Sequence, residues 1–150
     1  MTPTIEQARE VLKQYFGYPD FRAPQLPAIC AVLSRRDAVI VLPTGGGKSI
    51  CFQVPALCLN RLAVVVSPLI SLMADQVQAL ERRGIAATFL NSTLPPDEAQ
   101  ARIDRIRRRE IRLLYVAPER LIAGATTKLL AETGVDLLAI DEAHCVSQWG

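Results

Sequence analysis

Two short stretches of the sequence combine residue types that handle phosphate groups. The first, PTGGGKS at 43–49, follows the apolar run 38–42 and precedes a segment with helical character. Glycines let the backbone turn its N–H groups toward phosphate oxygens, and the start of a helix favours an anion. A lysine adds a point charge for the β- and γ-phosphates, and a serine hydroxyl can bind Mg²⁺. The residues expected to hold a nucleotide here are Thr44, Gly45, Gly46, Gly47, Lys48 and Ser49.

The second stretch, DEAHC at 141–145, ends another apolar run and contains two adjacent carboxylates. Ligands of a parallel α/β sheet bind beyond the carboxyl ends of its strands, so we expect Asp141 and Lys48 around one nucleotide. Asp141 is suited to holding Mg²⁺ through water, and Glu142 to orienting or deprotonating an attacking water. A site that only binds nucleotide needs no Glu142. The alternatives are a tight turn with an incidental lysine, and an ordinary acidic strand end.

The elements that must position these residues alternate along the chain. Strands are expected at 38–42, 62–67, 86–90, 112–117 and 137–141, most of them nearly all apolar, as strands covered on both faces require. Helices are expected at 5–15, 24–34, from about 48, over 69–84 with Gly84 as a cap, and from 95. The helix at 69–84 has an apolar face formed by Leu69, Leu72, Met73, Gln76, Val77 and Leu80. The alternation predicts a three-layer α/β/α protein with a mainly parallel sheet.

Composition restricts the class of protein. The chain has 150 residues, half of them apolar, and a net charge of +2, so it is expected to fold as one domain, 1–150. No apolar run is long enough to span a bilayer, and the first residues lack the layout of a secretion signal. The four cysteines form no CxxC pair and there is one histidine, which gives zinc little support. Cys51 and Cys58 are interpreted as buried thiols in a reducing cytoplasm.

Several motifs together resemble the RecQ family of ATP-dependent DNA helicases, in superfamily 2. LKQYFGYPDFRAPQ is similar to that family's adenine-recognition motif, and LPTGGGKS to its P-loop, including Leu42 where the common pattern has glycine. VVVSPLISLMADQV, LNST, LLYVAPERL and DEAHCVSQWG resemble further family motifs. The resemblance implies a RecA-like P-loop NTPase lobe, with residues 1–34 as its adenine-recognition helices.

The family's site residues are carried over by matching motif positions. The resemblance implies that Gln25 makes paired hydrogen bonds to adenine, that Tyr18 stacks on the base and that Arg22 lies against it. It also implies DNA contacts by five residues: Ser67, Asn91, Ser92, Gln148 and Trp149. Trp149 suits a base-stacking platform, and His144 resembles a sensor of the γ-phosphate.

The implied function is 3′-to-5′ DNA unwinding driven by ATP with Mg²⁺, in DNA repair and recombination. The expected partners are single-stranded and tailed duplex DNA and a second helicase lobe. The expected location is the bacterial cytoplasm, or the nucleus in a eukaryote. Because the sequence stops within the motif after DEAH, the chain is expected to be the first lobe cut short, inactive alone. The alternatives are a P-loop kinase, a non-enzymatic ATP- or DNA-binding module and, nearer, an RNA helicase.

Arginines crowd the end of the helix that starts at 95. They are a candidate DNA-phosphate patch, but a solvated helix end favoured by the helix dipole is the preferred interpretation. The cluster consists of Arg102, Arg105, Arg107, Arg108, Arg109 and Arg112.

Overall fold

The computed structural model of the chain describes residues 4–34, 49–59, 61–122 and 124–140. It divides into two compact units, Met1–Asn60 and Arg61–Gly150, which are treated separately below. Among the described residues, no helix has the length and apolar character needed to cross a membrane. The strand expected at 38–42 lies outside the described residues.

The first unit is helical. It contains α1 (Ile5–Val11), a π-helical segment η1 (Leu12–Phe16), a 3₁₀ turn η2 (Ala23–Gln25), α2 (Leu26–Leu33) and α3 (Ile50–Cys58). Thr4 begins α1 by accepting a hydrogen bond from the Gln7 N–H at 3.2 Å, while the Gln7 side chain accepts from the Thr4 N–H at 2.8 Å. Helix α3 packs against α1 and α2. The two expected helices at 5–15 and 24–34 therefore form, but each includes a non-α segment.

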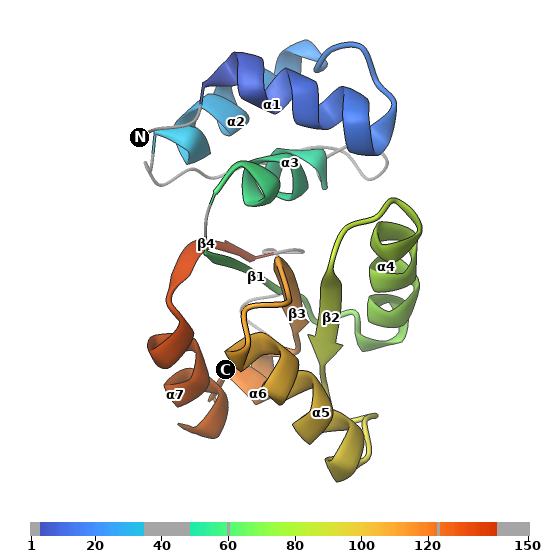
Figure 1. Cartoon of the computed structure of the whole chain (residues 1–150), viewed down its shortest axis with the longest axis vertical. Coiled ribbons are helices and arrows are strands. Elements are labelled where there is room, and N and C mark those ends of the chain that lie inside the picture. The colour runs from blue at the N-terminus through green and yellow to red at the C-terminus, as the bar shows by residue number, and fades with distance from the viewer. Residues whose placement is uncertain (1–3, 35–48, 60, 123, 141–150) are drawn as a thin grey trace. The chain divides into compact units, whose positions relative to one another are not determined.

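A four-stranded sheet organises the second unit. Its strands are β1 (Leu62–Val66), β2 (Ala87–Leu90), β3 (Leu113–Val116) and β4 (Val135–Ile140), in the order β2-β3-β1-β4 (Figure 1). Every neighbouring pair is parallel, with Val64 beside Leu114 and Leu138 in the two registers of β1. All four strands therefore end at one edge of the sheet, which we call the carboxyl edge.

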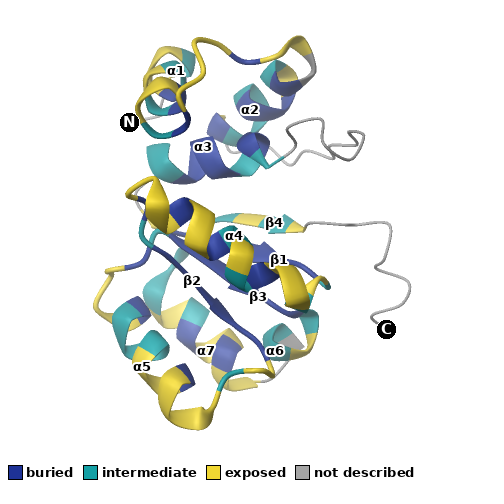
Figure 2. Cartoon of the chain, turned by 90° about the vertical axis from the view of Figure 1, so that its right-hand side faces the viewer, coloured by how far each residue is buried: buried dark blue, intermediate teal, exposed yellow. Residues whose placement is uncertain are grey.

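Helices lie on both faces of this sheet. Helix α4 (Ile70–Arg82) packs against β2 on one face, whereas α5 (Pro96–Arg107), α6 (Pro118–Ile122) and α7 (Gly124–Thr133) lie on the other (Figure 1). On the face covered by α5 and α7, helices and strands share one apolar cluster, which includes Val64, Leu114, Ile106 and Leu129. Strands β1, β2 and β3 are buried along their length (Figure 2). The α/β class, the parallel sheet and the three layers are confirmed.

Some local predictions differ from the structure. Leu69 and Leu72 are 36% and 44% exposed, because the buried stripe of α4 is the narrower set Met73, Val77 and Leu80. β4 was expected to be covered on both faces, but Leu138 is 56% exposed, so one face of this strand is largely uncovered by the described residues. Helices α6 and α7 were not predicted, since their sequence has only a weak apolar stripe with two buried side chains in α7.

Three helix-to-strand turns close the opposite edge of the sheet. Each contains a residue with positive φ: Gly84 after α4, Arg109 after α5 and Gly134 after α7, at 82°, 61° and 81°. The first is a helix cap in which the Ile85 N–H donates to the Leu80 carbonyl at 3.0 Å, as Gly84 was predicted to provide. At Gly134 an added Cβ would also lie 3.0 Å from the Arg61 side chain, which would have to shift slightly.

We expect Leu114→Ala to lower the free energy of unfolding by about 2–5 kcal/mol. Leu114 is completely buried at the centre of β3, and its removal leaves a cavity between the sheet and α5. The measurement is urea denaturation followed by far-UV circular dichroism. Leu138→Ala is the matched control, because this leucine is more than half exposed and its loss is expected to cost less than about 1 kcal/mol. Equal losses in both variants would contradict the assignment of the core.

Candidate nucleotide and nucleic-acid site

Most residues of the two phosphate-handling stretches lie outside the described part of the chain. The predicted site residues among them are Thr44, Gly45, Gly46, Gly47, Lys48, Asp141, Glu142 and His144; Gln148 and Trp149, further along the chain, also lie outside the described part. Their neighbours are described. Ser49 immediately precedes α3, and Ile140, which comes before Asp141 in the sequence, ends β4 at the carboxyl edge of the sheet. The roles of the undescribed residues therefore stay predictions, whereas the elements next to them are those that the predictions require.

Ser49 has a geometry suited to a ligand-binding hydroxyl. It begins α3 through its backbone, since the Gln53 N–H donates to the Ser49 carbonyl at 2.9 Å, while its side chain makes no capping hydrogen bond to the helix. The hydroxyl is therefore not consumed by the helix end and fits an oxygen ligand of Mg²⁺. In the first turn of α3, burial raises the pKa of the Cys51 thiol, so this side chain stays neutral.

The three residues matched to the adenine-recognition motif lie in one loop and the turn that follows it. Gly17 ends η1 in a left-handed conformation with φ 75°, which lets the chain reverse direction without a side-chain clash. Tyr18 follows and is 51% exposed, and Arg22 is also exposed. Both side chains are therefore accessible to a ligand.

Gln25 is buried, with 5% of its surface exposed, and its orientation is fixed by the loop. Its Oε1 atom accepts a hydrogen bond from the Arg22 N–H at 2.8 Å. This bond uses one of the two lone pairs of the carbonyl oxygen and so orients the amide. The contact of Gln25 with adenine stays a prediction.

The described residues matched to DNA contacts all follow strands of the second unit at the carboxyl edge. Ser67 follows β1 and is 1% exposed, with its Oγ atom accepting from the Leu69 N–H at 3.2 Å. Asn91 follows β2 and is 3% exposed. Its Oδ1 atom accepts from the Thr93 N–H at 2.9 Å, and its amide nitrogen donates to the Met73 sulfur at 3.4 Å. Ser92 is exposed. Ser67 and Asn91 thus shape their loops, and Ser92 is the accessible hydroxyl.

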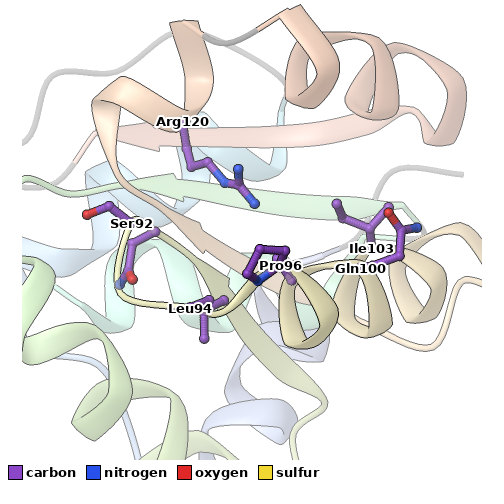
Figure 3. A pocket seen from close by; sticks show the side chains of 8 residues that line it. Ser92, Leu94, Pro96, Gln100, Ile103 and Arg120 are labelled. Carbon is purple, nitrogen blue, oxygen red and sulfur yellow. The ribbon is translucent and has the colours of Figure 1, made fainter.

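A pocket of about 380 Å³ lies at this edge, between the loop after β2, the start of α5 and α6 (Figure 3). Asn91 and Ser92 line it, and the guanidinium of Arg120 reaches across it toward Pro96 (Figure 3). The Nε atom of Arg120 is buried and has no hydrogen-bond partner among the described residues. Arg120 was not assigned a role from the sequence, although LLYVAPERL, the motif containing it, was noted.

The arginine cluster at the end of α5 is largely paired with protein groups. Arg102 donates to the Thr88 hydroxyl at 3.0 Å and lies 4.4 Å from the centre of the Phe89 ring, so it fastens α5 to β2. Glu110 lies 3.9 Å from Arg105 and is hydrogen-bonded to Arg108, and Glu132 lies 3.8 Å from Arg107. These acids offset the positive charge locally, which favours a solvated helix end over a DNA-phosphate patch.

Comparison with known proteins identifies the fold and the family. The model of the family "DEAD/DEAH box helicase" matches residues 22–150. Among solved structures, a hypothetical ATP-dependent RNA helicase from Sulfolobus tokodaii is similar over 97% of this chain and 43% of its own, with a TM-score of 0.71 and 21% identity. This likeness bears on the fold alone, and it supports the α/β fold described above.

Curated relatives are more similar in sequence. The chain is 47% identical over 143 residues to the ATP-dependent DNA helicase RecQ of Haemophilus influenzae, which covers 95% of the chain and 23% of that protein. It is 46% identical over 147 residues to RecQ of Bacillus subtilis, covering 97% of the chain and 25% of that protein. The chain thus spans about a quarter of the length of the curated relatives it matches. The resemblance seen in the motifs is confirmed, and the chain belongs to the DEAD/DEAH box helicases as an N-terminal helicase region of the RecQ family.

Proposed function

We propose that the chain is the ATP-binding lobe of a 3′-to-5′ DNA helicase of the RecQ type, acting in DNA repair and recombination. The observation that carries the proposal is the similarity, over 95% or more of the chain, to relatives named ATP-dependent DNA helicases. The protein works together with a second lobe, which supplies the other half of the ATP cleft. Its partners are ATP and single-stranded or tailed duplex DNA.

In the proposed nucleotide site, each group has a separate task. Tyr18, Arg22 and Gln25 receive the adenine, and the 44–48 backbone with Lys48 receives the phosphates. The Ser49 hydroxyl, and Asp141 through water, would hold Mg²⁺, which would offset charge on the β- and γ-phosphates. Glu142 orients the attacking water and takes its proton.

The carboxyl edge of the second unit is the proposed track for one DNA strand. Ser92 donates its hydroxyl to a phosphate oxygen, and Asn91 holds the loop that presents it. Arg120 completes the pocket with a charge that has no acid partner in the described part of the chain. The carboxylates of Asp97 and Glu98 lie in the first turn of α5 and repel an anion at the start of this helix. The DNA phosphate is therefore proposed to contact Ser92 and Arg120 and not the helix start.

We expect Arg120→Ala to weaken binding of single-stranded DNA regardless of sequence and to reduce the slope of log K against log salt by about 1. The reason is that one phosphate contact and its released counterion are lost. The measurement is fluorescence anisotropy of labelled oligonucleotides across a salt series. Arg107→Ala is the control, because Arg107 lies 3.8 Å from Glu132 and away from the pocket. An unchanged salt slope for Arg120→Ala would contradict this contact.

The function as a whole is tested by ATP turnover and strand separation in the full-length protein. We expect ATP hydrolysis to rise when single-stranded DNA is added, and a duplex with a 3′ tail to separate only when ATP and Mg²⁺ are present. A P-loop kinase would show no stimulation by DNA, and a binding module would show no turnover. Either result would overturn the proposal.

An RNA helicase is the second candidate. It is favoured by one specific observation, the DEAH residues at 141–144, which also occur in RNA helicases. The 46% identity to a relative named an ATP-dependent DNA helicase outweighs this short motif. Unwinding of matched DNA and RNA duplexes separates the two candidates, and preferential unwinding of RNA would favour the second.

A further inference from the structure

An ion pair holds the middle of the loop that carries Tyr18 and Arg22. Asp20 lies in this loop, and its Oδ1 atom accepts hydrogen bonds from the Arg9 Nε at 3.0 Å and from the Phe21 N–H at 2.7 Å. Arg9 belongs to α1, so one carboxylate oxygen joins the loop both to the preceding helix and to its own backbone. The neighbouring Phe21 ring is 8% exposed and gives the loop a buried anchor.

The anchored residues, Asp20 and Phe21, lie between Tyr18 and Arg22 in the sequence. Tyr18 precedes Asp20 by two positions and Arg22 follows it by two, and both of these side chains are accessible. The Arg22 N–H in turn orients the Gln25 amide. A displacement of Asp20 would therefore move Tyr18 and Arg22 together, and with Arg22 the N–H that orients Gln25.

We propose that Asp20, paired with Arg9, is a positioning residue that holds Tyr18, Arg22 and Gln25 in the arrangement that receives an adenine base. This inference rests on the proposed ATP-binding function and adds a residue to which no role was given by the motif. Asp20 acts through its neighbours and does not touch the nucleotide.

The charges around the pair support it. The Arg9 guanidinium, followed by the Phe21 N–H, holds the pKa of the Asp20 carboxyl below its ordinary value, and Lys13 acts in the same direction. Glu6 is the second acid near Arg9, with its Oε1 atom 3.1 Å from the Arg9 Nη1. Asp20 is thus ionised at neutral pH. An exposed pair of this kind contributes little to global stability, so its effect is expected to be local.

The test is Asp20→Asn in the full-length protein. Asparagine keeps an oxygen for the Phe21 N–H but loses the charge that binds Arg9. We expect the KM for ATP to rise about twofold to fivefold with kcat unchanged. The inhibition constant of inorganic tripolyphosphate, which has no base, should stay at the wild-type value. A merely structural defect would weaken both ligands or lower kcat.

Glu6→Gln is the matched control, because it removes the other acid of Arg9 without touching the loop. It should leave the KM for ATP unchanged. Arg9→Gln combined with Asp20→Asn should be no worse than either single variant, since both break the same pair. Equal loss of tripolyphosphate binding, an unchanged KM, or additive losses would overturn the proposal. Failure of the proposed function would look different, because the wild-type protein itself would then show no ATP turnover and Gln25→Ala would change nothing.

Discussion

Glu142→Gln is expected to lower kcat for ATP hydrolysis by about 10²–10⁴ while the protein still binds ATP. The amide has the shape of the carboxylate, but it cannot take the proton of the attacking water or stabilise the charge that develops on it. Because Glu142 is proposed to act on water and not on the nucleotide, the ground-state complex should form normally. The measurement is the Kd of a fluorescent ATP analogue beside single-turnover hydrolysis.

The control for this substitution is Glu81→Gln, which makes the same chemical change on an exposed position of α4. It should leave both binding and hydrolysis unaltered. A variant at Glu142 that loses binding and hydrolysis in parallel would show that this carboxylate maintains the site's structure, and the proposed assignment of the water-activating group would then be wrong.

The second large effect is expected from Lys48→Ala, which should lower kcat/KM for ATP by about 10²–10³ or more. Lys48 is the cation of the glycine-rich stretch, and a fixed positive donor acts both on the bound phosphates and on the charge of the transition state. Unlike Glu142→Gln, this change should weaken ATP binding as well as hydrolysis. Isothermal titration with ATP and Mg²⁺, beside steady-state turnover, separates the two effects.

Lys128→Ala provides the comparison for Lys48→Ala, since Lys128 is an exposed lysine of α7. A circular dichroism melting curve should show that both variants fold. Wild-type turnover in Lys48→Ala would refute the assignment of residues 43–49 as a phosphate-binding loop.

The general architecture could be predicted because the apolar pattern and the fold agree in the centre of the sheet. β1, β2 and β3 are short apolar runs that the structure buries, and Gly84 ends α4 as a left-handed cap. The pattern failed where burial depends on neighbours distant in sequence. Leu72 and Leu138 have apolar side chains that match a buried face, but the described residues do not cover them.

For the candidate site, too, the sequence predicted some features and could not predict others. The family resemblance proposed roles for Gln25 and Ser92, which stay predictions, but it could not show that the Asn91 amide is occupied by Thr93 and Met73. Arg120 and Asp20 were missed for a related reason. A lone arginine or aspartate has no periodicity, and its importance comes from a pocket or from a partner eleven residues away, as in the Arg9–Asp20 pair.

The two edges of the sheet also differ in how many amino-acid substitutions they tolerate during evolution. The turns at Gly84, Arg109 and Gly134 admit few residue types, because positive φ is unfavourable for most side chains. The loops at the carboxyl edge have no described residue with positive φ, and exposed positions such as Ser92 can mutate with little loss of stability. Ligand preference can therefore drift across lineages while the scaffold persists, in keeping with the same fold in a protein of only 21% identity.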